Sequence, residues 1–291
     1  MKNRLLSLLL TAAVLLTLVP MAALADTSCA HDDPGDPCGV RSAQAYTTAH
    51  DSDSHHDDHE DHDDHEAHED HEDACTTHSW DAGCLTTKMT DTCDGHVTYT
   101  CSACGQTKDV TLPAGGSPFV DVQDSSQYYY SHVLSCFDSG IVCGTSDFEF
   151  SPGETCTRAQ LVTFLYRLAG KPTVDSSDNP FQDVKAGAYY YDAVLWGYQN
   201  EIVYGTSADE FSPDATVTRA QTVTFLYRYA GKPAHNAEKC PFTDVPDTYY
   251  TDAVLWGCQN GIVYGTDSTT FSPNAGCTRA QAVTFLCRCK S

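Results

Sequence analysis

The sequence predicts a mainly α-helical fold in which three helix–loop–helix repeats pack about a shared core. Two sets of strings lead to this prediction. Similar copies of "VTRAQTVTFLYRYAGKP" begin at Cys156, Val217 and Cys277. The strings "PFVDV", "PFQDV" and "PFTDV" begin at Pro118, Pro180 and Pro241. A single unit of this kind cannot bury both of its apolar faces, so the three copies are expected to pack against one another.

The longer string predicts the second helix of each repeat. Thr218 can cap a helix while Gln221, three residues later, reaches back to the amide of the cap, which makes a capping box. The pairs Thr157/Gln160 and Thr278/Gln281 repeat this pattern. Apolar residues then recur every three or four positions and form one face. Gly231 suits a left-handed position after the helix, and Pro233 prevents its continuation.

The first helix of each repeat is predicted from strings such as "YYYDAVLWGYQN", Tyr189 to Asn200. A loop containing glycine and proline follows it and leads to the second helix. The "FxDV" strings place an aspartate before each first helix, at Asp121, Asp183 and Asp244. These aspartates are interpreted as structural residues that cap the turn before the first helix.

Residues 1–25 are predicted to be a secretory signal peptide. Lys2 and Arg4 form a basic start, an apolar run follows, and Ala23-Leu24-Ala25 has the small residues of a cleavage site. The apolar run is too short for a spanning helix, which predicts an exported chain without membrane insertion after cleavage. The formal net charge of −24 argues against a nucleic-acid partner, because such binding depends on clustered lysine and arginine.

Residues 26–73 are predicted to be disordered, and from residue 51 they are rich in His, Asp and Glu. Imidazoles in this run predict labile, multi-site binding of divalent metal ions, with zinc, copper and nickel as suitable ions. The alternative is a solvated acidic spacer. The histidines concerned are His55, His56, His59, His62, His65, His68 and His71.

Residues 74–114 are cysteine-rich and predict a small zinc-ribbon-like β module. Cys75 and His78 form a C-x2-H pair, and Cys101 and Cys104 form a C-x2-C pair. Two such pairs can hold a structural zinc ion in a tetrahedral Cys3His site. Disulfides are the alternative in an exported chain. Cys84 and Cys93 leave both readings open, because they can replace His78 or pair with each other. Residues 115–117 are predicted to be a linker.

The repeated strings "FxDV", "YYxDAVLWG", "NGIVYGT" and "CTRAQAVTFL" resemble S-layer homology (SLH) repeats, at residues 118–173, 174–234 and 235–291. The resemblance implies a pseudo-threefold helical bundle. It also implies that grooves between the repeats bind a secondary cell-wall polysaccharide carrying pyruvylated sugars. The expected location is therefore the cell wall or cell surface.

By this resemblance the polysaccharide-binding residues are Arg158, Arg219, Arg279, Trp196 and Trp256. An arginine fork can hold a ketal carboxylate through two parallel hydrogen bonds, and a tryptophan face offers flat contact to a sugar ring. Ser135 takes the place of the tryptophan in the first repeat, so the grooves are expected to be unequal. The alternatives are arginines that pair with neighbouring carboxylates and tryptophans that belong to the core.

Catalytic motifs are missing from this sequence, which predicts that the chain is not an enzyme. The leading hypothesis is a cell-envelope protein that docks on wall polysaccharide and displays the acidic, metal-chelating region. One alternative is a secreted metal-binding or metal-delivery protein that the repeats only localise. Another is a structural subunit of a surface lattice.

Overall fold

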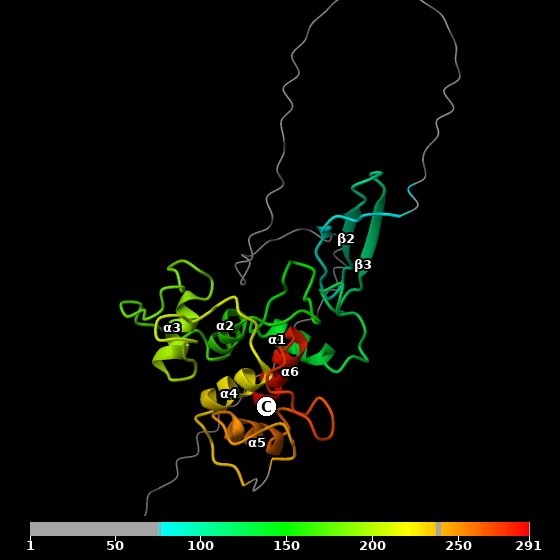
Figure 1. Ribbon diagram of the computed structural model, residues 1–291. Coiled ribbons are helices and arrows are strands. Elements are labelled where there is room, and N and C mark those ends of the chain that lie inside the picture. Colours follow the sequence, from blue (N-terminus) through cyan, green and yellow to red (C-terminus); the bar gives the residue numbers. More distant parts are fainter. Residues whose placement is uncertain (1–74, 76, 237–239, 291) are drawn as a thin grey trace, which may run out of the picture. The chain divides into compact units, whose positions relative to one another are not determined.

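The computed structural model describes residue 75 and residues 77–236 and 240–290. These ranges contain six helices and one three-stranded sheet (Figure 1). The predicted signal peptide and the histidine-rich run lie outside the described residues. Among the helices in the described ranges, none has the length and apolar character needed to cross a bilayer.

The predicted β module contains a small antiparallel sheet. Its strands are β1 (Cys84–Thr87), β2 (Gly95–Thr100) and β3 (Thr107–Leu112). The strands lie in the order β1-β2-β3, and β2 pairs with β3 over its whole length. Val97 of β2 and Leu112 of β3 are fully buried, as expected for strands with one covered face.

Each repeat contributes two helices, which confirms the predicted mainly helical repeat architecture. The helices are α1 (Tyr130–Asp138), α2 (Arg158–Leu168), α3 (Tyr191–Gln199), α4 (Arg219–Tyr229), α5 (Thr251–Gln259) and α6 (Arg279–Lys290). The second helix of one repeat packs against the first helix of the next, as α2 on α3 and α4 on α5. Helix α6 packs against α1, so the last repeat returns to the first.

Backbone hydrogen bonds close the three repeats into a ring at the residue before each capping threonine. The Cys156 N–H donates to the Cys277 carbonyl at 2.8 Å, and the Cys277 N–H donates to the Val217 carbonyl at 2.9 Å. The Val217 N–H completes the ring by donating to the Cys156 carbonyl at 2.9 Å. All three residues are fully buried, so each repeat satisfies a polar group of another where water cannot.

The predicted capping boxes begin the second helices. The Thr218 hydroxyl accepts from the Gln221 N–H, and the Gln221 side chain accepts from the Thr218 N–H. The same reciprocal bonds join Thr157 to Gln160 and Thr278 to Gln281. Gly231 follows α4 with a φ of 83°, which confirms the left-handed position predicted for it.

The aspartates of the "FxDV" strings are structural, but they do not cap the turn before the first helix. Asp183 instead accepts hydrogen bonds from the N–H groups of Phe211 and Ser212, at 2.8 and 2.6 Å. Ser212 has a φ of 58°, in the left-handed region that costs a non-glycine residue free energy. The carboxylate therefore holds the loop before the second helix in this conformation. Asp121 and Asp244 do the same in the other repeats.

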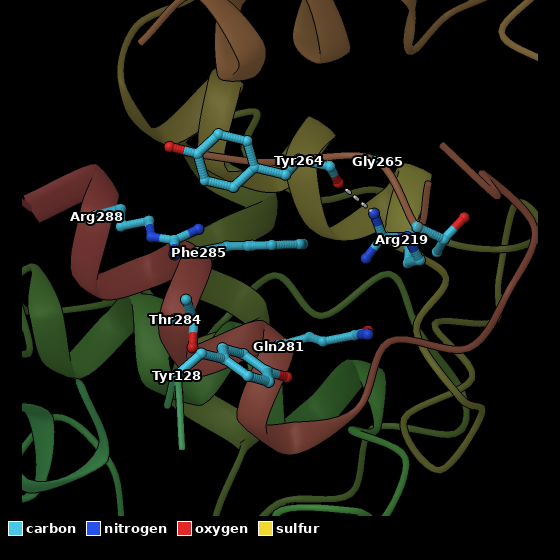
Figure 2. A pocket seen from close by; sticks show the side chains of 9 residues that line it. Tyr128, Arg219, Tyr264, Gly265, Gln281, Thr284, Phe285 and Arg288 are labelled. Carbon is cyan, nitrogen blue, oxygen red and sulfur yellow. Dashed lines mark hydrogen bonds between the residues drawn. The ribbon is translucent and has the colours of Figure 1, made fainter. Parts of the chain in front are cut away.

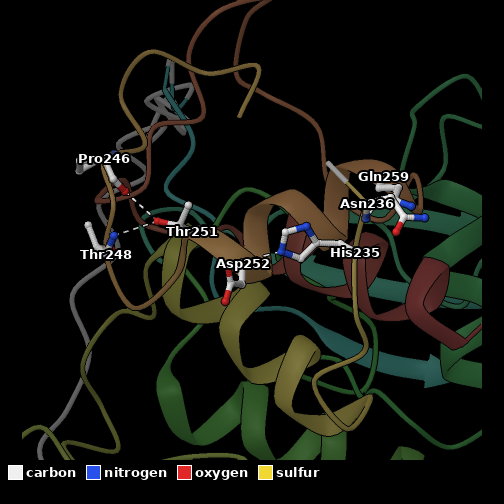
Figure 3. A network of polar contacts seen from close by, with 7 residues as sticks. All are labelled: His235, Asn236, Pro246, Thr248, Thr251, Asp252 and Gln259. Carbon is white, nitrogen blue, oxygen red and sulfur yellow. Dashed lines mark hydrogen bonds and ion pairs between the residues drawn. The ribbon is translucent and has the colours of Figure 1, made fainter. Parts of the chain in front are cut away.

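The first residues of the third repeat are tied to α5 (Figure 3). The Asn236 N–H donates to the Gln259 side chain at 2.8 Å, and His235 Nε2 lies 3.4 Å from an Asp252 carboxylate oxygen. At the start of α5 the Thr251 hydroxyl accepts from the Thr248 N–H and donates to the Pro246 carbonyl. These bonds fix where the first helix of the repeat begins.

Candidate functional site

The arginine that opens each second helix is buried and reaches into the next repeat. Arg219 Nε donates to the Phe271 carbonyl at 2.8 Å, and its Nη2 donates to the Tyr264 carbonyl at 2.7 Å. Arg158 makes the same pair of bonds to Phe211 and Tyr204, and Arg279 makes them to Phe150 and Cys143. The three arginines thus join the repeats in a closed cycle.

Each arginine and one "FxDV" aspartate act on opposite ends of the same peptide group. The carbonyl of the Phe271–Ser272 peptide accepts from Arg219, and the N–H of that peptide donates to Asp244 at 2.7 Å. The guanidinium faces the negative end of the peptide dipole and the carboxylate faces its positive end. This arrangement neutralises a buried cation without direct contact between the two charges.

Burial lowers the pKa of each of the three arginines. Burial lowers the pKa of Arg158 to about 10, and the charges of Tyr249 and Asp183 oppose that change. Burial also lowers the pKa of Arg219. The Arg219 guanidinium lies 4.7 Å from the Phe271 ring centroid, so it gains cation–π contact in addition to its hydrogen bonds.

The two predicted tryptophans lie in the core. Trp196 and Trp256 are both buried. The Trp196 ring centroid lies 5.6 Å from that of Tyr166, and the Trp256 centroid lies 5.5 Å from that of Tyr227. Each pair joins the first helix of one repeat to the second helix of the repeat before it. In this placement the tryptophans support the junctions between repeats.

A cavity of about 430 Å³, here named groove three, opens beside the third repeat (Figure 2). All three repeats contribute to its wall. The lining residues are Tyr128, Arg219, Tyr264, Gly265, Thr266, Gln281, Thr284, Phe285 and Arg288. Figure 2 shows Tyr264 and Arg288 along one side, Tyr128 beside Gln281, and Arg219 near the Tyr264 carbonyl.

Groove three combines positive charge with exposed aromatic surface. Arg219 and Arg288 line it, and its lining residues include no carboxylate. The Arg288 guanidinium lies 4.9 Å from the Tyr264 ring centroid. Tyr128 and Tyr264 are 54% and 59% exposed, so both rings are accessible to a ligand. The groove therefore suits a ligand with a flat, weakly polar face and a negative group.

The structure brings together a different set of groove residues from those selected from the sequence. Of the predicted five, Arg219 lines groove three, while the two tryptophans do not. Tyr128, Tyr264 and Arg288 were missed. Their signals were present in the sequence as the "YYY" run, the "VYGT" string and the second arginine of the longer repeated string.

The four predicted zinc ligands lie together in the β module. One donor atom from each of Cys75, His78, Cys101 and Cys104 lies within 4.8 Å of all the others. Cys84 is exposed and is not part of this group. The sequence spacing therefore predicted which side chains converge.

Comparison with known proteins identifies the repeats. The family model for the S-layer homology domain matches residues 118–162, 180–223 and 241–283. The chain carries three SLH domains. These matches confirm the family that the repeated strings resemble. Each match contains the first helix of its repeat and ends within the second.

Several curated relatives share the SLH region. The chain is 30% identical over 181 residues to the surface-layer 125 kDa protein of Lysinibacillus sphaericus, which covers 59% of this chain and 15% of that protein. It is 32% identical over 176 residues to an endoglucanase of a Bacillus species, and the match covers 58% of this chain and 18% of the endoglucanase. It is 24% identical over 146 residues to the cellulosome-anchoring protein of Acetivibrio thermocellus, covering 48% and 33%.

These matches establish a cell-surface protein that is anchored through its SLH domains. The chain spans less than a fifth of the length of the first two relatives. Relatives with enzyme names match through the SLH region alone, so their activities do not transfer with the match. The absence of an enzyme activity in this chain stays a prediction.

Proposed function

We propose that groove three binds a pyruvylated secondary cell-wall polysaccharide and thereby anchors the chain non-covalently to the wall. The observation that carries this proposal is the pairing of two arginines with two exposed tyrosines in one cavity. The name of the cellulosome-anchoring relative agrees with an anchoring role. A cavity of about 430 Å³ is large enough for one or two sugar rings by the usual size of ligand sites.

The groove residues divide the recognition between them. The ring of Tyr264 offers a flat surface to a sugar, and the Arg288 fork beside it can form two charge-assisted hydrogen bonds to a ketal carboxylate. Arg219 has a different role. It donates to the Tyr264 carbonyl and so positions the loop that carries the tyrosine. The predicted arginine contributes to binding chiefly through this positioning.

Binding of this kind is short-range. The chain carries a formal net charge of −24, so an anionic polymer gains no long-range attraction from the protein as a whole. Salt screens exposed charges over about 10 Å at 0.1 M but acts less on groups held in a partly closed groove. We therefore expect wall binding to persist as salt is raised, unlike the binding of a basic surface patch.

A wall pull-down tests the proposal. The mature chain is expected to sediment with purified walls and to stay in solution after the pyruvylated polymer has been extracted. Arg288→Lys keeps the charge but loses the planar fork, and it is expected to weaken binding about tenfold. Lys232→Ala is the matched control, because Lys232 is an exposed cation that pairs with Glu201 and is not among the residues lining groove three. Equal binding by the two variants would refute the groove assignment.

A second part of the proposal concerns the histidine-rich run, residues 51–73. Six imidazoles spaced three residues apart, a seventh beside the first of them, and thirteen carboxylates favour weak, multi-site binding of divalent metal ions at the cell surface. Capture should fall as the pH drops below about 6.5, where imidazole becomes protonated. Titration with Zn(II) of the mature chain and of a variant lacking residues 51–73 tests this. The same number of zinc ions bound by both would show that the run does not bind the metal.

A further inference from the structure

The β module carries a four-residue cluster that wall anchoring leaves unused. Cys75 and His78 precede β1, whereas Cys101 and Cys104 lie in the turn between β2 and β3. Two backbone hydrogen bonds hold these segments together. The Ser102 N–H donates to the Ser79 carbonyl, and the Asp81 N–H donates to the Thr100 carbonyl, both at 2.9 Å. The fold of the module thus brings the two pairs of side chains close together.

The spacing of the donor atoms matches a tetrahedral zinc site. Zn–S bonds of about 2.3 Å and Zn–N bonds of about 2.0 Å at tetrahedral angles place two sulfurs about 3.8 Å apart and a sulfur and a nitrogen about 3.5 Å apart. The Cys75 and Cys101 sulfurs are 4.0 Å apart, and Cys104 Sγ lies 3.5 Å from His78 Nδ1. No other group of three or more such ligands occurs in the described residues.

We propose that this cluster binds one structural zinc ion through three thiolates and the Nδ1 atom of His78. The protein fills all four positions, so the ion holds the module together and leaves no open position for a substrate. Binding displaces the protons of the cysteine thiols to solvent and involves no change of oxidation state. The proposal is independent of polysaccharide binding by the SLH domains.

The geometry favours a metal over a disulfide. A disulfide needs sulfurs about 2.05 Å apart, roughly half the separation of Cys75 and Cys101. Three cysteines converge, so one disulfide would leave the third thiol beside His78 without a partner. The His78 ring also stacks on Trp80 at 4.9 Å between centroids, which orients the imidazole towards the sulfurs. A small module of this kind usually needs a metal or covalent staple to fold.

The test uses the full mature chain in which the seven histidines of the run are replaced by Asn, so that the run offers no imidazole. Titration with Co(II) under reducing conditions is expected to saturate at one ion per chain. The absorption should show thiolate charge-transfer bands and the intense visible bands of tetrahedral Co(II), and Zn(II) should abolish both. Saturation without these bands would overturn the proposal.

Single substitutions in the same background locate the site. Cys104→Ser is expected to lower the affinity for Co(II) at least tenfold, whereas Cys84→Ser, which removes an exposed thiol of the same module, is expected to leave it unchanged. His78→Cys should still bind one ion, with stronger charge-transfer absorption from a fourth thiolate. An equal loss of Co(II) affinity in the Cys84→Ser and Cys104→Ser variants would overturn the proposal. A disulfide between any two of Cys75, Cys101 and Cys104 in the protein as isolated, found by mass spectrometry, would also overturn it.

Discussion

The first and third repeats share one buried framework but differ at the side chain that faces the groove. Arg279 donates to two carbonyls of the first repeat just as Arg219 donates to two carbonyls of the third. The residue whose carbonyl receives Nη2 is Tyr264 in the third repeat and Cys143 in the first. Tyr264 is 59% exposed and Cys143 only 7%. The buried framework is thus the same in the two repeats, whereas the exposed side chain at this position differs.

The junctions between repeats show the same contrast. Tyr166 packs on Trp196 where the first repeat meets the second, and Tyr227 packs on Trp256 where the second meets the third. Where the third meets the first, the corresponding residues are Cys287 and Ser135. The closing junction therefore lacks the aromatic pair, although α6 still packs on α1. Unequal grooves were expected from Ser135, and the position equivalent to Tyr264 of groove three is also different in the first repeat, where it is Cys143.

The largest expected effect is the loss of a framework arginine. Arg219→Ala should lower the free energy of unfolding by about 4 kcal/mol, because the carbonyls of Phe271 and Tyr264 lose their donor at about 1–3 kcal/mol each and a cation–π contact is lost. Arg279→Ala should cost a similar amount if the framework is equivalent in all repeats. Urea unfolding of both variants measures this. A cost below about 1 kcal/mol for either would contradict a structural role for these residues.

Removal of an aromatic pair should have the next largest effect. Trp196→Ser gives the first junction the residue found at the closing junction. We expect it to lower the free energy of unfolding by about 3 kcal/mol, because a large buried side chain leaves a cavity. The equivalent substitution Trp256→Ser should lower the free energy of unfolding by the same amount. Thermal unfolding checks both, and an unchanged melting temperature would show that the tryptophans do not support the junctions.

The contrast between the first and third repeats can be sharpened at Tyr264. Tyr264→Ala removes the exposed ring that the first repeat also lacks, and it should weaken wall binding three- to tenfold through the loss of stacking. Stability should hardly change, because the side chain is exposed and its backbone carbonyl still accepts from Arg219. Tyr264→Phe should bind walls as well as the unchanged chain does if the face of the ring makes the contact. Wall-binding isotherms for the two variants decide this.

The smallest expected effect concerns the helix caps. One capping box is removed by each of the substitutions Thr157→Ala, Thr218→Ala and Thr278→Ala. Each substitution should lower the free energy of unfolding by about 1 kcal/mol. Because all three boxes have the same hydrogen bonds, the three costs should agree within the error of urea unfolding. A clearly larger cost in one repeat would show that the caps are not equivalent.

The sequence predicted the features that depend on neighbouring residues. The capping box of Thr218 and Gln221 and the left-handed Gly231 each need only a few residues of context, and both are present. The convergence of Cys75, His78, Cys101 and Cys104 was also predictable, because two short spacings nearly determine it. In each case the pattern itself contains the physical reason.

The features that were missed depend on distant partners. Nothing in the residues next to Arg219 indicates that its hydrogen-bond acceptors lie 45 and 52 residues away in another repeat. Asp183 was expected to act locally, yet it holds a loop 28 and 29 residues later. Tyr128 became a groove residue only because the first repeat lies beside the third. The residues next to such a position in the sequence carry no direct signal of its distant partner.

The bonds from Arg279 to the first repeat set the order in which the domain can be completed. Its acceptors, the carbonyls of Phe150 and Cys143, precede it by 129 and 136 residues. A growing or translocating polypeptide therefore exposes those carbonyls long before their donor emerges. The closed ring of three repeats can form only after the final helix is available.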